Sequence, residues 1–211
     1  MRTANINLYK WSELRKEAQE KLIEIERKER MKSATRAYFE PLIEEVINTW
    51  GKKAGFNIKV SDVLYDISGA PNTGLSFITS GEIDVVKTLE VASLVFPNCQ
   101  GVLDYIRENE YYNHVINYYR FTVERDYKES TMYAVSCKFE DTNKGVFFDS
   151  DADMEALDVA EDIEAFVNKV KNYLCEIMFN KVSDSFYYLI SDESIIQVLE
   201  DREFTSDGKM V

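Results

Sequence analysis

Histidine and cysteine are scarce in this chain, which has one histidine and three cysteines in 211 residues. Cys99, Cys137 and Cys175 are spaced 38 residues apart, and neither a close cysteine pair nor a cysteine–histidine cluster occurs. Structural zinc sites need such clusters, so the sequence predicts no metal site, and nothing in it indicates another cofactor. Apolar residues surround Cys137 and Cys175, which predicts buried free thiols of the kind that persist in a reducing cytoplasm.

Proline and glycine are also rare, with three and eight residues, and they leave little material for flexible linkers. No run approaches the roughly 18 apolar residues of a membrane-spanning helix, and the N-terminus lacks the apolar segment of a signal peptide. We therefore expect one domain over residues 1–211. Its expected parts are a helical 1–55, a sheet-rich 56–140, and an acidic loop with a helical segment over 141–211.

Positive charge is in short supply, because 25 basic side chains face 38 acidic ones and give a net charge of −13. Residues 1–60 carry 13 basic and 9 acidic side chains, whereas residues 61–211 carry 12 and 29. A surface of this charge does not neutralise phosphates, so we expect no direct binding of nucleic acid. Docking on an anionic membrane is excluded for the same reason.

The acidic side chains concentrate between Glu140 and Glu164, where ten carboxylates face Lys144 alone. A solvated helix start is the plain interpretation, since carboxylates suit the positive end of a helix dipole. Calcium binding is a second one, because aspartates at 149, 151 and 153 repeat the first ligands of an EF-hand loop. Met154 and Ala160 stand, however, where that loop needs glycine and a bidentate glutamate.

The third interpretation of this segment is a docking face for a partner protein with a basic surface, which such a face would attract over a distance. The side chains that this hypothesis assigns to partner binding are Asp149, Asp151, Asp153, Glu155, Asp158, Glu161 and Asp162.

Apolar periodicity predicts both helices and strands along the chain. Leu14, Ala18 and Leu22 begin an apolar stripe that predicts a helix capped by Ser12. Further helices are expected at residues 34–53, 84–95 and 191–199, and residues 154–190 are expected to form one long helix or two consecutive ones. Strands are expected at residues 5–9, 56–67, 75–79, 111–126 and 132–139. This order fits an α+β fold, in which an antiparallel sheet has helices packed mainly on one face and a long helical segment lies near the C-terminus.

Catalytic signatures are absent from the sequence, which contains no GxSxG, Walker or GxGxxG pattern. The single histidine, His114, lies in an aromatic run that we expect to form a strand, with Tyr112 on the same face. The turn at residues 68–74 contains hydroxyls and glycines, but no helix start follows it as phosphate binding would require. The sequence favours a role without catalysis. If the protein instead binds a small ligand, the site would comprise these residues, which we call the alternative ligand site: Ser68, Asn72, Thr73, Tyr112 and His114.

Three segments resemble an uncharacterised protein family of phages and prophages, whose members are often labelled antitoxin-like. They are residues 8–21 (LYKWSEL and KEAQEK), residues 55–84 (GF and YDI to GEID), and residues 189–209 (LISDESI with the tail EFTSDGK). The chain departs from the family pattern in its hairpin, which lacks an aspartate between Ser68 and Phe77. The family's histidine and tyrosine cluster is also reduced here to Tyr111, Tyr112 and His114.

This resemblance implies a phage- or prophage-encoded protein in the cytoplasm of a bacterial host. Together with the acidic charge, it leads to the hypothesis of an interaction protein that binds and inhibits a host defence nuclease or a toxin. Such an anti-CRISPR or anti-restriction protein would block a surface that binds nucleic acid. Two alternatives stay open: a ligand-binding protein or enzyme that uses residues 68–74 with His114, and a regulatory homo-oligomer that assembles through residues 154–190.

Overall fold

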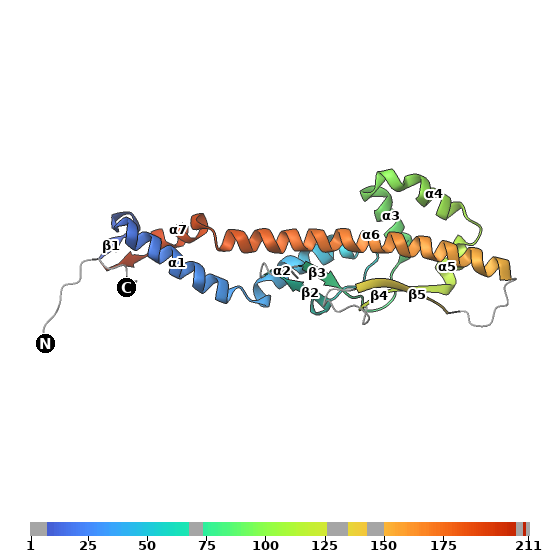
Figure 1. Cartoon of the computed structure of the whole chain (residues 1–211), viewed down its shortest axis with the longest axis horizontal. Helices are drawn as coiled ribbons and strands as arrows, with labels where there is room; N and C mark the ends of the chain where they lie inside the picture. The colour runs from blue at the N-terminus through green and yellow to red at the C-terminus, as the bar shows by residue number, and fades with distance from the viewer. Residues whose placement is uncertain (1–7, 68–73, 126–134, 143–149, 206–208, 210–211) are drawn as a thin grey trace. The chain divides into compact units, whose positions relative to one another are not determined.

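The computed structural model describes residues 8–67, 74–125, 135–142, 150–205 and 209 (Figure 1). The fold is α+β, as the sequence predicts, with two-stranded antiparallel sheets and a long C-terminal helix. The chain divides into two compact units. We call Met1–Phe39 with Val182–Val211 the terminal unit, and Glu40–Lys181 the central unit.

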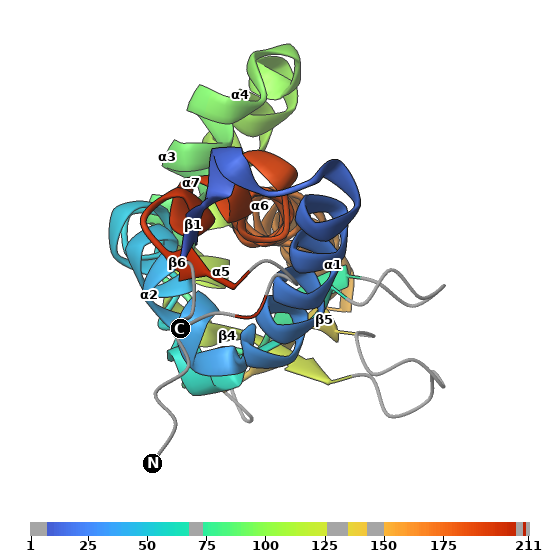
Figure 2. The ribbon, with the colours of Figure 1, turned by 90° about the vertical axis from the view of Figure 1, so that its left-hand side faces the viewer.

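The terminal unit brings the two ends of the chain together (Figure 2). Strand β1 (Tyr9–Lys10) pairs antiparallel with β6 (Glu203–Phe204), and helix α1 (Lys16–Ser33) packs against α7 (Asp192–Glu200). The predicted cap at Ser12 is wrong, because a 3₁₀ turn (Trp11–Glu13) precedes α1. Ser191 caps α7, since its side chain accepts a hydrogen bond from Ser194 N. The core of the unit consists of Trp11, Leu14, Leu22, Ile195, Leu199 and Phe204.

Two arginines of α1 hold the start of α7 in place. Arg30 Nη1 donates to Leu189 O and to Ser194 Oγ, each over 2.9 Å. Arg27 forms an ion pair with Asp192 and donates from Nε to Ile190 O over 3.1 Å. Arginine can satisfy several carbonyls at a helix end at once, so α1 completes the hydrogen bonding of the turn before α7.

The central unit begins within α2 (Arg36–Val46), which contains Pro41 and continues into a π-helical turn (Ile47–Gly51). After a 3₁₀ turn (Val60–Asp62), β2 (Val63–Asp66) pairs antiparallel with β3 (Gly74–Phe77). Three helices follow: α3 (Val85–Val95), α4 (Gln100–Glu108) and α5 (Tyr112–Tyr118). The last strands, β4 (Tyr119–Arg125) and β5 (Val135–Asp141), pair antiparallel before α6 (Ser150–Leu189).

The β4–β5 pair has a buried and an exposed face. Phe121 lies opposite Phe139 and Val123 opposite Cys137, and Phe121, Val123 and Cys137 are buried. Helix α6 lies against this pair, since two of its side chains bond to the backbone of β5. The residues that α6 buries recur at helical spacing. Its buried residues in this unit are Ala156, Val159, Ala160, Ile163, Phe166, Val167, Val170, Lys171, Leu174 and Met178.

Several sequence-based boundaries are corrected by the structure. The expected strand at 111–126 is a helix over its first half, α5, and a strand only from Tyr119. Residues 56–62 form no strand, and α4 was not expected. The described strands pair in three separate two-stranded sheets. Within the described parts of the chain, no helix is both long and apolar enough to cross a membrane.

Candidate functional site

Four carboxylates lie exposed along the first half of α6, and we call Glu155, Asp158, Glu161 and Asp162 the acidic face. The spacing of three and four residues between Asp158, Glu161 and Asp162 places them side by side on a helix. Asp151 and Asp153 belong to the backbone of α6, but their side chains lie outside the described part, as does Asp149. The structure therefore brings together four of the seven residues assigned to partner binding.

The acidic face has no cation partner within the described residues. Some carboxylates elsewhere in the central unit are paired: Glu45 lies 2.5 Å from Lys181, and Glu82 lies 2.6 Å from Arg120. No described lysine or arginine forms such a pair with Glu155, Asp158, Glu161 or Asp162. The repulsion between these carboxylates is thus left uncompensated in the described structure.

Two large apolar side chains accompany the acidic face. Met154 is 61% exposed and Leu157 is 41% exposed. They are three residues apart, and Asp158 and Glu161 follow them at spacings of four, so all four lie along one stripe of α6. Methionine is enriched in protein interfaces relative to the rest of the surface.

The pKa of Glu164, at the inner border of the acidic face, is shifted by burial and by neighbouring charges. Burial raises the pKa of this half-buried carboxyl, and the negative charge of Glu161 raises it further. Lys138 on β5 acts in the opposite direction and lowers the pKa of Glu164. A positive charge brought to this surface would favour the ionised form of Glu164.

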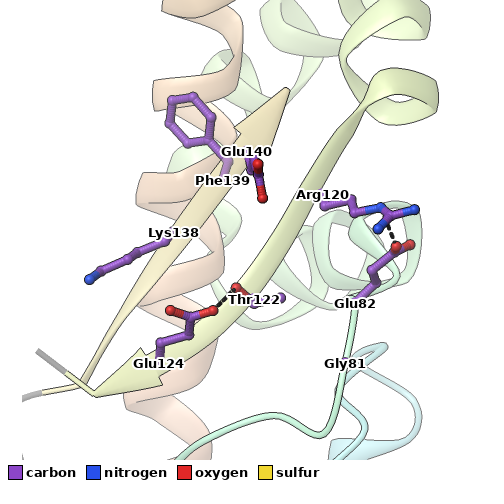
Figure 3. Close-up of a pocket in the computed structure, with 8 residues that line it drawn as sticks. All are labelled: Gly81, Glu82, Arg120, Thr122, Glu124, Lys138, Phe139 and Glu140. Carbon is purple, nitrogen blue, oxygen red and sulfur yellow. Dashed lines mark hydrogen bonds and ion pairs between the residues drawn. The ribbon is translucent and has the colours of Figure 1, made fainter. Parts of the chain in front are cut away.

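A hollow of about 660 Å³ lies on the exposed face of β4 and β5 (Figure 3). Arg120 pairs there with Glu82, and Thr122 Oγ1 donates to Glu124 Oε1 over 3.1 Å. The hollow mixes both signs of charge and contains neither a histidine nor a cysteine. It is lined by Gly81, Glu82, Arg120, Thr122, Glu124, Lys138, Phe139 and Glu140.

The alternative ligand site is only partly described. Ser68, Asn72 and Thr73 lie outside the described residues. Tyr112 and His114 lie on helix α5 rather than on one face of a strand, so the expected shared face is wrong: residues two apart on a helix point in different directions. The His114 ring packs against Tyr118, with 4.8 Å between ring centroids.

Tyr112 is half-buried, and burial raises its pKa, with Glu90 adding to the rise and Arg107 opposing it. A phenol with a raised pKa stays protonated, so Tyr112 is no ready base. Among the described residues, no three histidine, cysteine, aspartate or glutamate side chains form a group that could hold a metal ion.

The cysteines are free thiols; Cys137 is buried as predicted, whereas Cys175 is only partly buried. Burial raises the pKa of Cys137 to about 12 and that of Cys175 to about 11. The negative charge of Glu164 contributes to the rise at Cys137. Because only the thiolate reacts, these two residues are chemically inert at neutral pH.

Sequence reasoning missed two polar residues on the inner side of α6. Lys171 is buried and donates from Nζ to Val135 O over 2.5 Å. Asn168 Oδ1 accepts a hydrogen bond from Cys137 N over 3.0 Å. The available signal was a lysine between Val167, Val170 and Leu174, at a position where the apolar stripe predicts a core residue.

Comparisons of the chain with family models, with curated proteins and with solved structures find no match.

Proposed function

We propose that this protein is an acidic interaction protein that binds a partner with a basic surface through the acidic face of α6. The observation that carries this proposal is the set of four exposed carboxylates without a described cation partner, beside exposed Met154 and Leu157. Charged groups would draw the partner in, and the two apolar side chains would add contact area once it is bound.

The charge of the central unit supports the same proposal. Of the 38 acidic side chains of the protein, 25 belong to this unit, against 13 of the 25 basic ones. A field of one sign raises the rate of encounter with a partner of opposite sign, and salt weakens that effect. Such a partner would use lysines and arginines that otherwise contact phosphates, so the acidic face would exclude nucleic acid from them.

The class of partner rests on the resemblance of the chain ends and the first hairpin to a phage and prophage family. A protein of that origin has a host defence nuclease, such as a CRISPR effector or restriction enzyme, or a toxin, as a suitable target. Inhibition would be stoichiometric, because the mechanism needs no catalytic group. The alternative ligand site gains no support from the packing of His114 against Tyr118.

The test compares three proteins as bait in a bacterial lysate. The first is the wild type and the second, the face variant, carries Asp158→Asn, Glu161→Gln and Asp162→Asn. The third, the control variant, carries Glu→Gln at three exposed positions of the central unit that do not belong to the acidic face: 44, 90 and 176. Both variants lose three negative charges, so they match in net charge and differ in where the charges are removed.

We expect the wild type and the control variant to retain the same protein, and the face variant to lose it. Added double-stranded DNA or RNA should release the retained protein, since both compete for its basic surface. Mass spectrometry then identifies the partner. Equal retention by the face variant, or retention that nucleic acid does not reduce, would refute docking through the acidic face.

A further inference from the structure

Three polar side chains follow one line on the inner face of α6: Asn168, Lys171 and Cys175. Their spacings of three and four residues place them on the same side of the helix. The Ser76 side chain and the Phe77 backbone, at the end of β3, lie close enough to Cys175 to lower the pKa of its thiol, against the larger effect of burial. Asn168 and Lys171 bind the backbone of β5. All three therefore lie beside groups that belong to strands.

The bonds of Asn168 and Lys171 meet β5 on its outer edge. In an antiparallel pair, the backbone groups of alternate residues point toward and away from the partner strand. Val135 O and Cys137 N bond to α6, so residues 135, 137, 139 and 141 direct their backbone groups away from β4. This edge would otherwise be a template for another strand.

The opposite edge of the pair is covered by the protein's own chain. Thr79 N donates to Val123 O over 3.1 Å, and Ile83 N donates to Phe121 O over 2.8 Å. The edge of β5 is covered in a different way, by side chains of a helix. Lys171 is only 7% exposed, and a buried ammonium is costly, so its contact with Val135 O is a specific arrangement rather than incidental packing.

The sequence of β5 is suited to pair with itself. If two copies met antiparallel with Phe139 opposite Phe139, residues 137 and 141 would face each other, and all these residues direct their backbone groups outward. On the exposed face, Lys138 of each copy would then lie opposite Glu140 of the other. Such an isologous pairing would add hydrogen bonds and two opposite-charge contacts at once.

We infer that Asn168 and Lys171 seal the outer edge of β5 against pairing with the β5 edge of a second copy of this chain. The seal is a conformational device, because two side chains on α6 decide whether the edge accepts another strand. Removal of their hydrogen-bonding groups leaves Val135 O and Cys137 N unpaired. In this register, a second β5 strand would satisfy Cys137 N through the carbonyl oxygen of its residue 141.

The experiment replaces the two side chains by apolar ones of similar size, Asn168→Leu with Lys171→Met. The matched control changes the same residue types on the exposed side of α6, Asn172→Leu with Lys169→Met. Sedimentation and light scattering should show a concentration-dependent doubling of the mass for the unsealed variant, relative to the wild type and the control. An unchanged mass in a variant of native helix content would overturn the inference.

Charge reversal on β5 tests whether the two copies pair through this strand in the proposed register. In the unsealed background, Lys138→Glu places like charges opposite each other and should abolish the doubling, while adding Glu140→Lys should restore it. A doubling that ignores these changes would overturn the inference. If the unsealed variant does not fold, Asn168→Ala serves instead: the Cys137 amide should then exchange with solvent at least tenfold faster than in Asn172→Ala, and equal rates would refute the seal.

Discussion

Gly55 shows how one residue fixes the approach of α3 to the preceding turn. Its φ is +78°, and a β-carbon there would lie 2.3 Å from the carbonyl oxygen of Asp84. Asp84 in turn caps α3 by accepting a hydrogen bond from Lys87 N. A side chain at position 55 would therefore strain the backbone and displace the start of α3.

We predict that Gly55→Ala lowers the free energy of unfolding by at least about 2 kcal/mol, since it combines a positive φ with a backbone clash. The control is Gly101→Ala, because a β-carbon at this helical position meets no atom within 4 Å. It should raise stability by about 0.5–1 kcal/mol. Urea unfolding of both variants checks the pair, and equal effects would contradict the close contact at Gly55.

The buried thiol of Cys137 should make the free energy of unfolding depend on pH in the alkaline range. Its pKa is raised from 9.0 to about 12, so above pH 9 the unfolded chain releases this proton while the folded chain retains it. The stability from this residue is complete below pH 9 and falls by about 1.4 kcal/mol per pH unit above it. Between pH 9 and 11, the stability of Cys137→Val should fall by about 1.4 kcal/mol per pH unit less than that of Cys99→Val, as measured by urea unfolding. Parallel pH profiles of the two variants would contradict the burial of Cys137.

At the scale of elements, the helices with a strong apolar stripe could be predicted from the sequence, and the segment at 111–126 could not. For residues 154–190 the sequence predicts one helix or two, and they form a single one, α6, in which many core positions repeat at helical spacing. Aromatic residues at 111–119 favour a strand by propensity alone. In the structure, α5 instead buries Val115 and stacks His114 on Tyr118, one helical turn away, so packing overrides propensity.

Part of the candidate site could likewise be predicted from the sequence, and part of it could not. Charge counting alone located the carboxylates from 155 to 162, because exposure is the ordinary state of a dense charge run. Sequence reasoning could not find Asn168 and Lys171, since their role depends on the backbone of β5, which lies about 30 residues away in the chain. Local periodicity contains no information about such a strand edge.

Arg30 provides a prediction for the terminal unit. It is mostly buried, contacts Leu189 O and Ser194, and lies 3.1 Å from Glu26. Arg30→Met leaves these groups without their donor, so we expect a loss of about 2–3 kcal/mol. Lys28→Met, which removes an exposed ion pair with Glu24, should change little.

The two tryptophans separate the units in this experiment, because Trp11 lies in the terminal unit and Trp50 in the central unit. In a Trp50→Phe background, fluorescence reports the terminal unit alone. Arg30→Met should lower the urea midpoint of this signal in relation to Lys28→Met. Coincident curves for the two variants would show that the arginine contacts do not stabilise the unit.

At the scale of the whole molecule, the charge is unevenly divided. The terminal unit carries 13 acidic and 12 basic side chains, so nearly all of the net charge of −13 belongs to the central unit. Self-repulsion of this kind lowers stability, and a surface selected for binding can retain it at that cost.

We therefore predict that the face variant (Asp158→Asn, Glu161→Gln, Asp162→Asn) is more stable than the wild type at low salt, by about 0.5–1 kcal/mol, because like charges three and four residues apart repel on a helix. The difference should shrink in 0.5 M salt, where screening acts over only a few ångströms. Thermal unfolding at two salt concentrations tests this. A face variant that is less stable than the wild type would show that these carboxylates stabilise the fold.

The most direct test of the account is the salt dependence of partner binding. The dissociation constant of the captured partner is measured between 50 and about 300 mM salt for the wild type, the face variant and the control variant. We predict that binding by the wild type and the control variant weakens steeply with salt, and that the face variant binds weakly with a shallow dependence. The same affinity and the same slope in all three proteins would contradict binding through the acidic face of α6.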